Sequence, residues 1–201
     1  MKDFFRKTTG ILPALAVAAC LGTTALLAPV LGSLPASAAE KPVQPEKNPP
    51  GDIPDSQVFI DYTSPLGFTL KVPEGWARSD RADGASFVDK LDGVAVTVSK
   101  ADAAPTVDSA KADYVAKLEA AGRAVKVSAV KQVKLPAGTA IRIVYTSNSE
   151  PNAVTNRQVR LENERYLYFK DGKLVALELY APKGADNVDQ WQLMSNSFRW
   201  K

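Results

Sequence analysis

One stretch of the sequence, residues 158–170, carries most of the side chains whose types and spacing could do chemistry. Its alternating pattern predicts a β-strand, and residues two apart on a strand point to the same face of the sheet. The candidate ligand-binding residues on and beside this strand are Arg157, Arg160, Glu162, Glu164 and Tyr166. Arg160 and Tyr166 could hold an anionic or sugar-like ligand, with the carboxylates as partners. The alternative is a solvated sheet face on which Arg and Glu form only weak ion pairs.

Glu162 and Glu164 are the closely paired carboxylates of this strand face. Residues i and i+2 lie about 6–7 Å apart, a spacing at which one carboxyl group can donate a proton and the other can act as base in glycoside cleavage. Nothing else in the sequence resembles a sugar cleft. We therefore predict a protein that is not an enzyme, and we keep a carboxylate-dependent hydrolase of the cell envelope as an alternative.

Two residue types that serve much of protein chemistry are scarce or missing. The 201-residue chain has no His, and its single Cys is Cys20, near the N-terminus. The remainder of the chain therefore cannot form a Ser-His-Asp triad, a thiol nucleophile, a disulfide or a Cys/His metal site. We predict no catalytic residue, no metal site and no cofactor.

The charge of the chain argues against nucleic acid as a partner. The formal net charge is +3, of which Lys2, Arg6 and Lys7 less Asp3 contribute +2, so that +1 remains for the rest. A nearly neutral domain lacks the positive field that draws proteins to nucleic acid.

The first 39 residues have the pattern of an export segment. Basic residues come first, the apolar run from Ile11 to Leu34 follows, and small residues lie around Ala38 and Ala39. This order predicts a signal peptide that is cut near Ala38 or Ala39. Two alternatives are an uncleaved membrane anchor and lipidation of Cys20. Each of the three places the domain outside the cytoplasm, either secreted or attached to the outer face of the membrane, with membrane contact through this segment only.

Residues 40–57 are rich in proline and charge and predict an extended linker without a core of its own. Such a segment suits a spacer that holds a domain away from a membrane. An unstructured N-terminus is the alternative.

Residues 58–201 predict an α+β domain, because short alternating segments joined by turns give a mainly antiparallel sheet and two helical patterns cover it. The first helix follows the N-cap Thr106 and ends at Gly122. Its counterpart starts near Asp186. Hairpin turns are predicted at Asp92-Gly93, Pro136-Ala137-Gly138 and Asp171-Gly172, a polar loop at residues 78–84, a bulge or sheet edge at Lys131, and an apolar stripe on the last helix at Val188, Trp191, Met194 and Phe198.

Four sequence motifs together resemble one known family. They are FTLKVPEGW at residues 68–76, ERYLYF at Glu164–Phe169, GKLVALELYAP at residues 172–182 and the closing SFRW. The chain resembles the PsbP-like fold family, whose bacterial secreted or lipid-anchored members are of unknown function. The resemblance implies an α/β/α sandwich around an antiparallel sheet and a binding or accessory role. Because the chain has no His, neither a metal role nor a photosystem partner is carried over.

These observations favour an exported, non-catalytic domain that binds a protein or another component of the cell envelope. A small-ligand carrier is a further alternative, and it requires an apolar cavity between a helix and the sheet.

Overall fold

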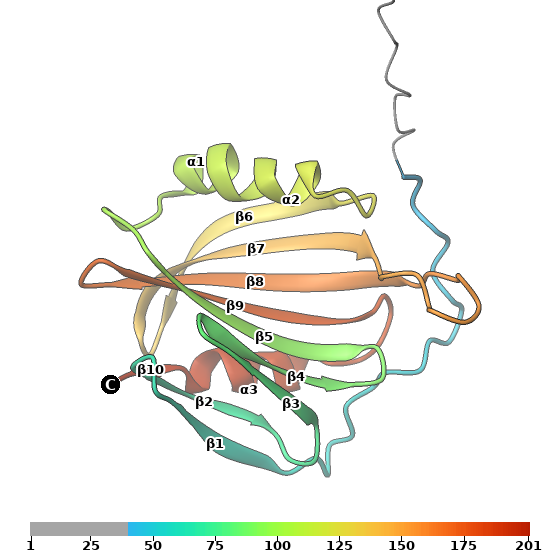
Figure 1. Ribbon diagram of the computed structural model, residues 1–201, viewed down its shortest axis with the longest axis horizontal. Helices are drawn as coiled ribbons and strands as arrows, with labels where there is room; N and C mark the ends of the chain where they lie inside the picture. The colour runs from blue at the N-terminus through green and yellow to red at the C-terminus, as the bar shows by residue number, and fades with distance from the viewer. Residues whose placement is uncertain (1–39) are drawn as a thin grey trace, which may run out of the picture. The chain divides into compact units, whose positions relative to one another are not determined.

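A seven-stranded antiparallel sheet forms the centre of the computed structural model, which describes residues 40–201 (Figure 1). Its strands are β3 (Ala77–Arg81), β4 (Gly84–Asp89), β5 (Asp92–Lys100), β6 (Lys126–Leu135), β7 (Gly138–Asn148), β8 (Arg160–Lys170) and β9 (Lys173–Pro182). They lie in the order β3-β4-β5-β9-β8-β7-β6, so that every neighbouring pair except β5–β9 is a hairpin. The leader, with its predicted cleavage site and with Cys20, lies outside the described residues and stays a prediction.

A second, smaller sheet lies beside the first. It consists of β1 (Phe59–Ser64), β2 (Phe68–Pro73) and β10 (Arg199–Trp200), with β2 in the middle. The motif FTLKVP thus pairs with the closing Arg199-Trp200, at the other end of the domain. The sequence predicts β1 and β2 as strands, whereas its assignment of the closing SFRW to the last helix is wrong for Arg199-Trp200, which form β10. It does not reveal that the three strands form a separate sheet.

Helices cover both faces of the large sheet, which confirms the α+β class. The first helical segment comprises α1 (Val107–Ser109), the π-helical turns η1 (Ala110–Val115) and α2 (Ala116–Ala120). It lies on the face opposite to α3 (Val188–Ser197), and α3 lies between the large sheet and the small one (Figure 1).

The N-terminus of the first helical segment has the predicted cap. Thr106 Oγ1 accepts a hydrogen bond from the Ser109 amide at 3.1 Å, and Ser109 Oγ accepts one from the Thr106 amide at 2.9 Å. This reciprocal pair satisfies two backbone donors that the first turn leaves unpaired.

Two of the local predictions are wrong. The β4–β5 hairpin turns at Lys90-Leu91, two residues before the predicted Asp92-Gly93, because Asp89 pairs with Asp92 and the strand already includes Gly93. A Cβ at Gly93 would lie 2.1 Å from the ring of Tyr180, so this glycine serves close packing rather than a turn. The predicted polar loop at residues 78–84 contains β3, an edge strand whose residues are all exposed.

The other turns and the β6 edge agree with the sequence, whereas the α3 stripe agrees in part. The chain reverses at Pro136-Ala137 and at Asp171-Gly172. β6 is an edge strand, with its bulge between Val127 and Ala129 rather than at Lys131. On α3, Trp191 and Met194 are buried as predicted, but Val188 is 70% exposed.

The core between the two sheets is built around Phe198, the residue directly after α3. Its ring stacks on Tyr168 of the large sheet at 4.2 Å between centroids and on Phe68 of the small sheet at 5.5 Å. A separate apolar cluster under the first helical segment contains Ala110, Ile141 and Leu167. Trp76 and Trp200 are partly buried and pack against the first core, as the sequence predicts.

The proline-rich residues 40–57, which we call the strap, run in extended form along one side of the domain (Figure 1). Hydrogen bonds hold the strap at both ends. Asn148 Nδ2 donates to Glu40 Oε1 and to the Lys41 carbonyl, and the Ile53 amide donates to Asn187 Oδ1 at 2.6 Å. The sequence gives no sign of these contacts. Within residues 40–201, no helix has the length and hydrophobicity needed to cross a bilayer.

Candidate functional site

A groove between α3 and strands β6–β8 contains the centre of the predicted strip. This α3 groove has a volume of about 380 Å³ and is lined by Val133, Lys134, Leu135, Arg142, Glu164, Tyr166, Val188, Gln192, Ser195 and Asn196. A smaller hollow of about 110 Å³ shares Glu164 and Val188 with it and adds Glu162 and Trp191. Two of the three predicted same-face residues in this region, Glu164 and Tyr166, thus lie in the groove, and the third, Glu162, lies in its extension.

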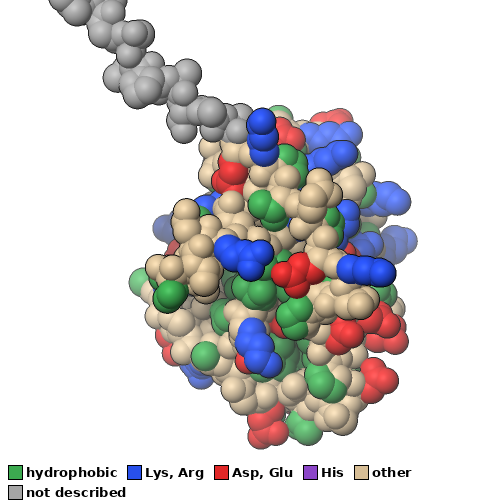
Figure 2. Space-filling model, turned by 90° about the vertical axis from the view of Figure 1, so that its right-hand side faces the viewer, with side chains coloured by type: hydrophobic (Ala, Val, Ile, Leu, Met, Phe, Trp, Pro, Cys, Tyr) green, Lys and Arg blue, Asp and Glu red, His purple; other side chains and the backbone are tan. Residues whose placement is uncertain are grey.

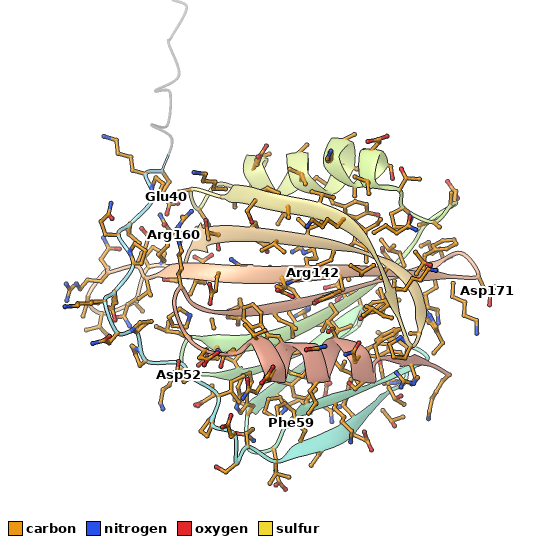
Figure 3. All side chains as sticks on the ribbon, turned by 180° about the vertical axis from the view of Figure 1, so that it is seen from behind. Glu40, Asp52, Phe59, Arg142, Arg160 and Asp171 are labelled. Carbon is orange, nitrogen blue, oxygen red and sulfur yellow. The ribbon has the colours of Figure 1, made fainter. Side chains whose placement is uncertain are left out.

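The floor of the α3 groove is an ion pair with a tyrosine attached to it. Arg142 Nε donates to Glu164 Oε2 at 3.0 Å, Arg142 Nη2 donates to Glu164 Oε1, and Tyr166 Oη donates to Glu164 Oε2 at 2.5 Å. The β7–β8 register makes this possible, because Arg142 is the cross-strand partner of Tyr166. Figure 3 shows Arg142 on the middle of the sheet, beside α3.

These contacts raise the pKa values of Arg142 and Tyr166. The hydrogen bond to Glu164 raises the pKa of Arg142, and burial together with the Glu164 contact raises the pKa of Tyr166 to about 12. Arg142 is therefore charged and Tyr166 is a neutral donor near neutral pH. The ion pair is stabilised by charge-assisted hydrogen bonds in a partly buried setting.

Glu162 differs from Glu164 in having no charged side chain bonded to it. Burial raises its pKa, and the Gly184 amide and the charge of Lys183 oppose that shift without cancelling it. The two carboxyl groups on one strand face therefore have different environments, one half-buried beside the small hollow and one paired with Arg142.

The two predicted arginines lie apart from the α3 groove. Arg157 is exposed in the loop before β8. Arg160 is only 5% exposed, and its guanidinium donates to the Ala124 carbonyl, to Asn148 Oδ1 and to Thr146 Oγ1. Figure 3 shows it near Glu40, at the strap. The prediction that Arg160 lies on a solvent-exposed face of the sheet is wrong. Carbonyl and side-chain oxygens at the neighbouring strand ends surround its guanidinium group.

Arg142 and the polar residues of α3 are the lining groups that sequence reasoning missed. Arg142 is the sole charged residue of β7, Gly138–Asn148, and a lone charge in an apolar strand is a usable signal. Gln192 and Asn196 have no such signal, because they belong to the ordinary polar side of a helix. Only the packing of α3 on the sheet brings them beside Arg142.

A second hollow lies on the opposite face of the sheet, beyond the end of α2. It measures about 350 Å³, and the residues that line it include Leu91, Tyr145, Asn163, Glu178 and Tyr180. At its base Tyr145 Oη and Arg165 both donate to the Glu178 carboxylate. Glu178 is thereby paired with one arginine and one tyrosine, as Glu164 is in the α3 groove.

The described residues include no set of three acidic side chains placed to hold a metal ion. Side chains of both charges lie among apolar ones on the face that carries the strap (Figure 2). The chemistry of the site is therefore that of hydrogen bonds, one ion pair and an apolar rim.

Comparisons with known proteins identify the fold. No protein-family model matches the chain, and no curated protein does. The solution structure of cyanobacterial PsbP (CyanoP) from Synechocystis sp. PCC 6803 aligns with a TM-score of 0.54 and 13% identity, over 75% of this chain and 98% of that chain. The chain has a PsbP-like fold. A crystal structure of a Bacteroides thetaiotaomicron VPI-5482 protein aligns with a TM-score of 0.48 and 12% identity, over 70% of this chain and 48% of that one.

The PsbP-like fold confirms the family resemblance read from the sequence motifs. FTLKVP forms β2, ERYLYF lies in β8, and GKLVALELYAP overlaps β9. At 13% identity the likeness shows the fold alone, and sites on a shared fold differ in chemistry.

Proposed function

We propose that this protein is an exported, non-catalytic binding domain that holds a protein or another component of the cell envelope in the α3 groove. The observation that carries the proposal is the Arg142–Glu164–Tyr166 network on the groove floor. It presents fixed donors and acceptors beside the exposed apolar side chain of Val188, and this combination of polar floor and apolar rim suits recognition.

The state of Glu164 favours binding over catalysis. Both of its oxygens accept hydrogen bonds, one from Arg142 alone and one from Arg142 and Tyr166. A carboxylate with its oxygens occupied in this way is a poor base or nucleophile, since it must first give up these bonds. Export is supported by the order of basic, apolar and small residues in the leader.

Site-directed photocrosslinking in the native envelope tests the binding proposal. A benzoylphenylalanine at Gln192, on the exposed wall of the groove, should form one discrete adduct. The same probe at Lys111, exposed on the opposite helical segment, is the matched control and should form none. Arg142→Ala should reduce the Gln192 adduct by about tenfold, since the groove floor loses its fixed donor. Equal adducts from both positions, or no adduct from Gln192, would contradict the proposal.

The raised pKa of Glu162 favours a second candidate, a carboxylate-dependent hydrolase. Two carboxyl groups on one strand face, of which Glu162 has a raised pKa, are the residue types that glycoside cleavage uses as acid and base. Purified cell-wall glycan is the probe for this activity. Turnover that disappears in both Glu162→Gln and Glu164→Gln would establish the hydrolase and overturn the non-catalytic proposal.

A further inference from the structure

Asp92, the first residue of β5, has a buried carboxyl group, and one of its oxygens lacks a hydrogen-bond donor in the described part of the chain. It is only 6% exposed, and no donor among residues 40–201 bonds to its Oδ1. The oxygen borders a hollow of about 90 Å³ that is lined by Pro50, Gly51, Asp52, Asp89, Lys90, Leu91 and Asp92 itself. Burying an ionised carboxylate without such a partner is costly, so the charge must be removed or balanced.

The surroundings of Asp92 offer little to balance its charge. Asp52 on the strap and Asp89 on the β4–β5 hairpin repel a negative charge on Asp92. Tyr180 of β9 is also close enough to interact electrostatically with that charge. Lys90 on the turn attracts the charge, but its ammonium group is largely exposed and lies 4.0 Å from Asp89. No set of three acidic side chains in the described part of the chain could hold a metal ion here. A proton is the remaining means of neutralising Asp92.

The strap closes the hollow directly over this carboxyl group. A Cβ built on Gly51 would lie 3.0 Å from Asp92 Oδ1 and 2.8 Å from Pro182, so a side chain has no room between strap and sheet. Four hydrogen bonds hold residues 51–53 of the strap in place. Asn187 Nδ2 donates to the Gly51 carbonyl and Gln190 Nε2 to the Ile53 carbonyl, while the Ile53 amide donates to Asn187 Oδ1 and the Asp186 amide to Asp52 Oδ1. Figure 3 shows Asp52 at this end of the strap.

We propose that the strap is a proton-controlled latch, closed over Asp92 while this carboxyl group is protonated and loosened when the group ionises. Opening gives the carboxylate access to water and removes the repulsion from Asp52. Burial, with the charge of Asp89, raises the pKa of Asp92 to about 7, which places the transition near neutral pH.

Opening of the latch has a consequence for the ligand-binding face. Asn187 holds the strap with both its amide oxygen and its amide nitrogen, and it also lines the small hollow beside Glu162. Release of the strap frees these polar atoms at the end of the α3 groove. The latch is independent of whether the groove binds a partner.

Hydrogen exchange on the full chain, kept soluble with a mild detergent, tests the latch without any ligand. The reporters are the amides of Ile53 and Asp186, and amides of β9 serve as the internal reference. Between about pH 5.5 and about pH 8.5, the protection factors of the reporters should fall by about 10- to 30-fold, after correction for intrinsic exchange. The β9 amides should keep their protection.

Two variants assign the effect to Asp92. Asp92→Asn should keep the strap closed at both pH values, because its side chain cannot ionise. Asp89→Asn, which alters the exposed neighbouring carboxyl group, should keep a transition but move it to lower pH, because the charge of Asp89 helps to raise the pKa of Asp92. An unchanged pH response in Asp92→Asn, or a strap equally protected at both pH values in the unmodified chain, would overturn the latch. Carboxyl-carbon NMR on the unmodified chain gives an independent result: titration of Asp92 below about pH 5 would also overturn it.

Discussion

At the scale of single residues, two acidic side chains show how this protein handles buried charge. Glu164 forms an ion pair with Arg142 and accepts a hydrogen bond from Tyr166. No donor in the described part of the chain bonds to Asp92 Oδ1, and burial raises the pKa of this carboxyl group to about 7. The difference follows from the neighbouring strands, since β7 supplies an arginine to one carboxylate and the strap supplies only a backbone and Asp52 to the other.

Removal of Arg142 should destabilise the protein more than removal of a surface arginine. Arg142→Ala leaves the Glu164 carboxylate, whose side chain is 13% exposed, without its counter-charge, and we expect a loss of about 1–3 kcal/mol. The matched control is Arg81→Ala, which breaks the exposed pair with Asp83 and should cost about 0.5 kcal/mol or less. Urea denaturation at neutral pH measures both. Equal losses in the two variants would show that the groove ion pair is no stronger than a surface pair.

Replacement of Asp92 should stabilise the protein in a pH-dependent manner. The carboxyl group has a pKa of about 7 in the folded protein, above its ordinary value of 3.8. As pH rises between these values, the unfolded chain loses the proton and the folded chain keeps it, so stability falls until about pH 7. Asp92→Asn should therefore gain nothing below about pH 4 and about 2–4 kcal/mol at pH 8. Denaturation at the two pH values measures the gain, and a gain independent of pH would refute this assignment.

At the scale of elements, β5 shows a glycine that long-range packing requires. Gly93 pairs with Tyr180 of β9, and the tyrosine ring lies across the position that a Cβ would take. The element can form only because one strand lacks a side chain where its neighbour places a large ring.

Gly93→Ala should lower stability by about 1–3 kcal/mol, because the new methyl group would collide with Tyr180 and force the ring or the strand to shift. In a Tyr180→Ala background the same change should cost less than about 0.5 kcal/mol. Thermal or urea unfolding of the four proteins in this double-mutant cycle supplies the measurement. If Gly93→Ala costs the same in both backgrounds, the glycine serves the backbone conformation instead of the close approach.

The same strand explains which parts of the fold the sequence could predict. Alternation of Val94, Val96 and Val98 correctly indicated β5, since strand periodicity depends on burial of one face. The turn was placed two residues late, because Asp-Gly is a strong local turn signal and Tyr180, which needs Gly93, is far away in the sequence. The sequence does not predict β3 for a related reason. An edge strand without a buried face has no alternation of apolar and polar residues.

The candidate site was predictable in part, on the same physical grounds. The two-residue alternation of side chains along a strand correctly predicted that Glu162, Glu164 and Tyr166 share one face of β8. Which residues oppose them depends on the β7–β8 register and on the packing of α3, neither of which local sequence determines. Arg160 shares the alternation, yet it lies at the strand end where loop and strand oxygens enclose its guanidinium. Contacts of the strap depend likewise on single asparagines distant in sequence.

At the scale of the whole molecule, the two sheets are joined through aromatic side chains between them. Phe198 contacts rings of both sheets, while Met194 and Trp191 of α3 fill the same core. The C-terminal segment thus supplies both the last helix and the residue that connects the layers. Stability of the small sheet should depend on this residue more than stability of the large sheet does.

Phe198→Ala should cost about 3–5 kcal/mol, because the ring is fully buried and its loss leaves a cavity between Phe68 and Tyr168. Leu193→Ala, which truncates a side chain of α3 that is 41% exposed, is the control and should cost less than about 1 kcal/mol. Denaturation measures both changes. Hydrogen exchange should in addition show β2 amides losing protection before β9 amides in Phe198→Ala, because β9 lies inside a seven-stranded sheet whereas β2 pairs only with β1 and the two-residue β10. Equal loss of protection in β2 and β9 would mean that the sheets unfold as one unit even without the connecting ring.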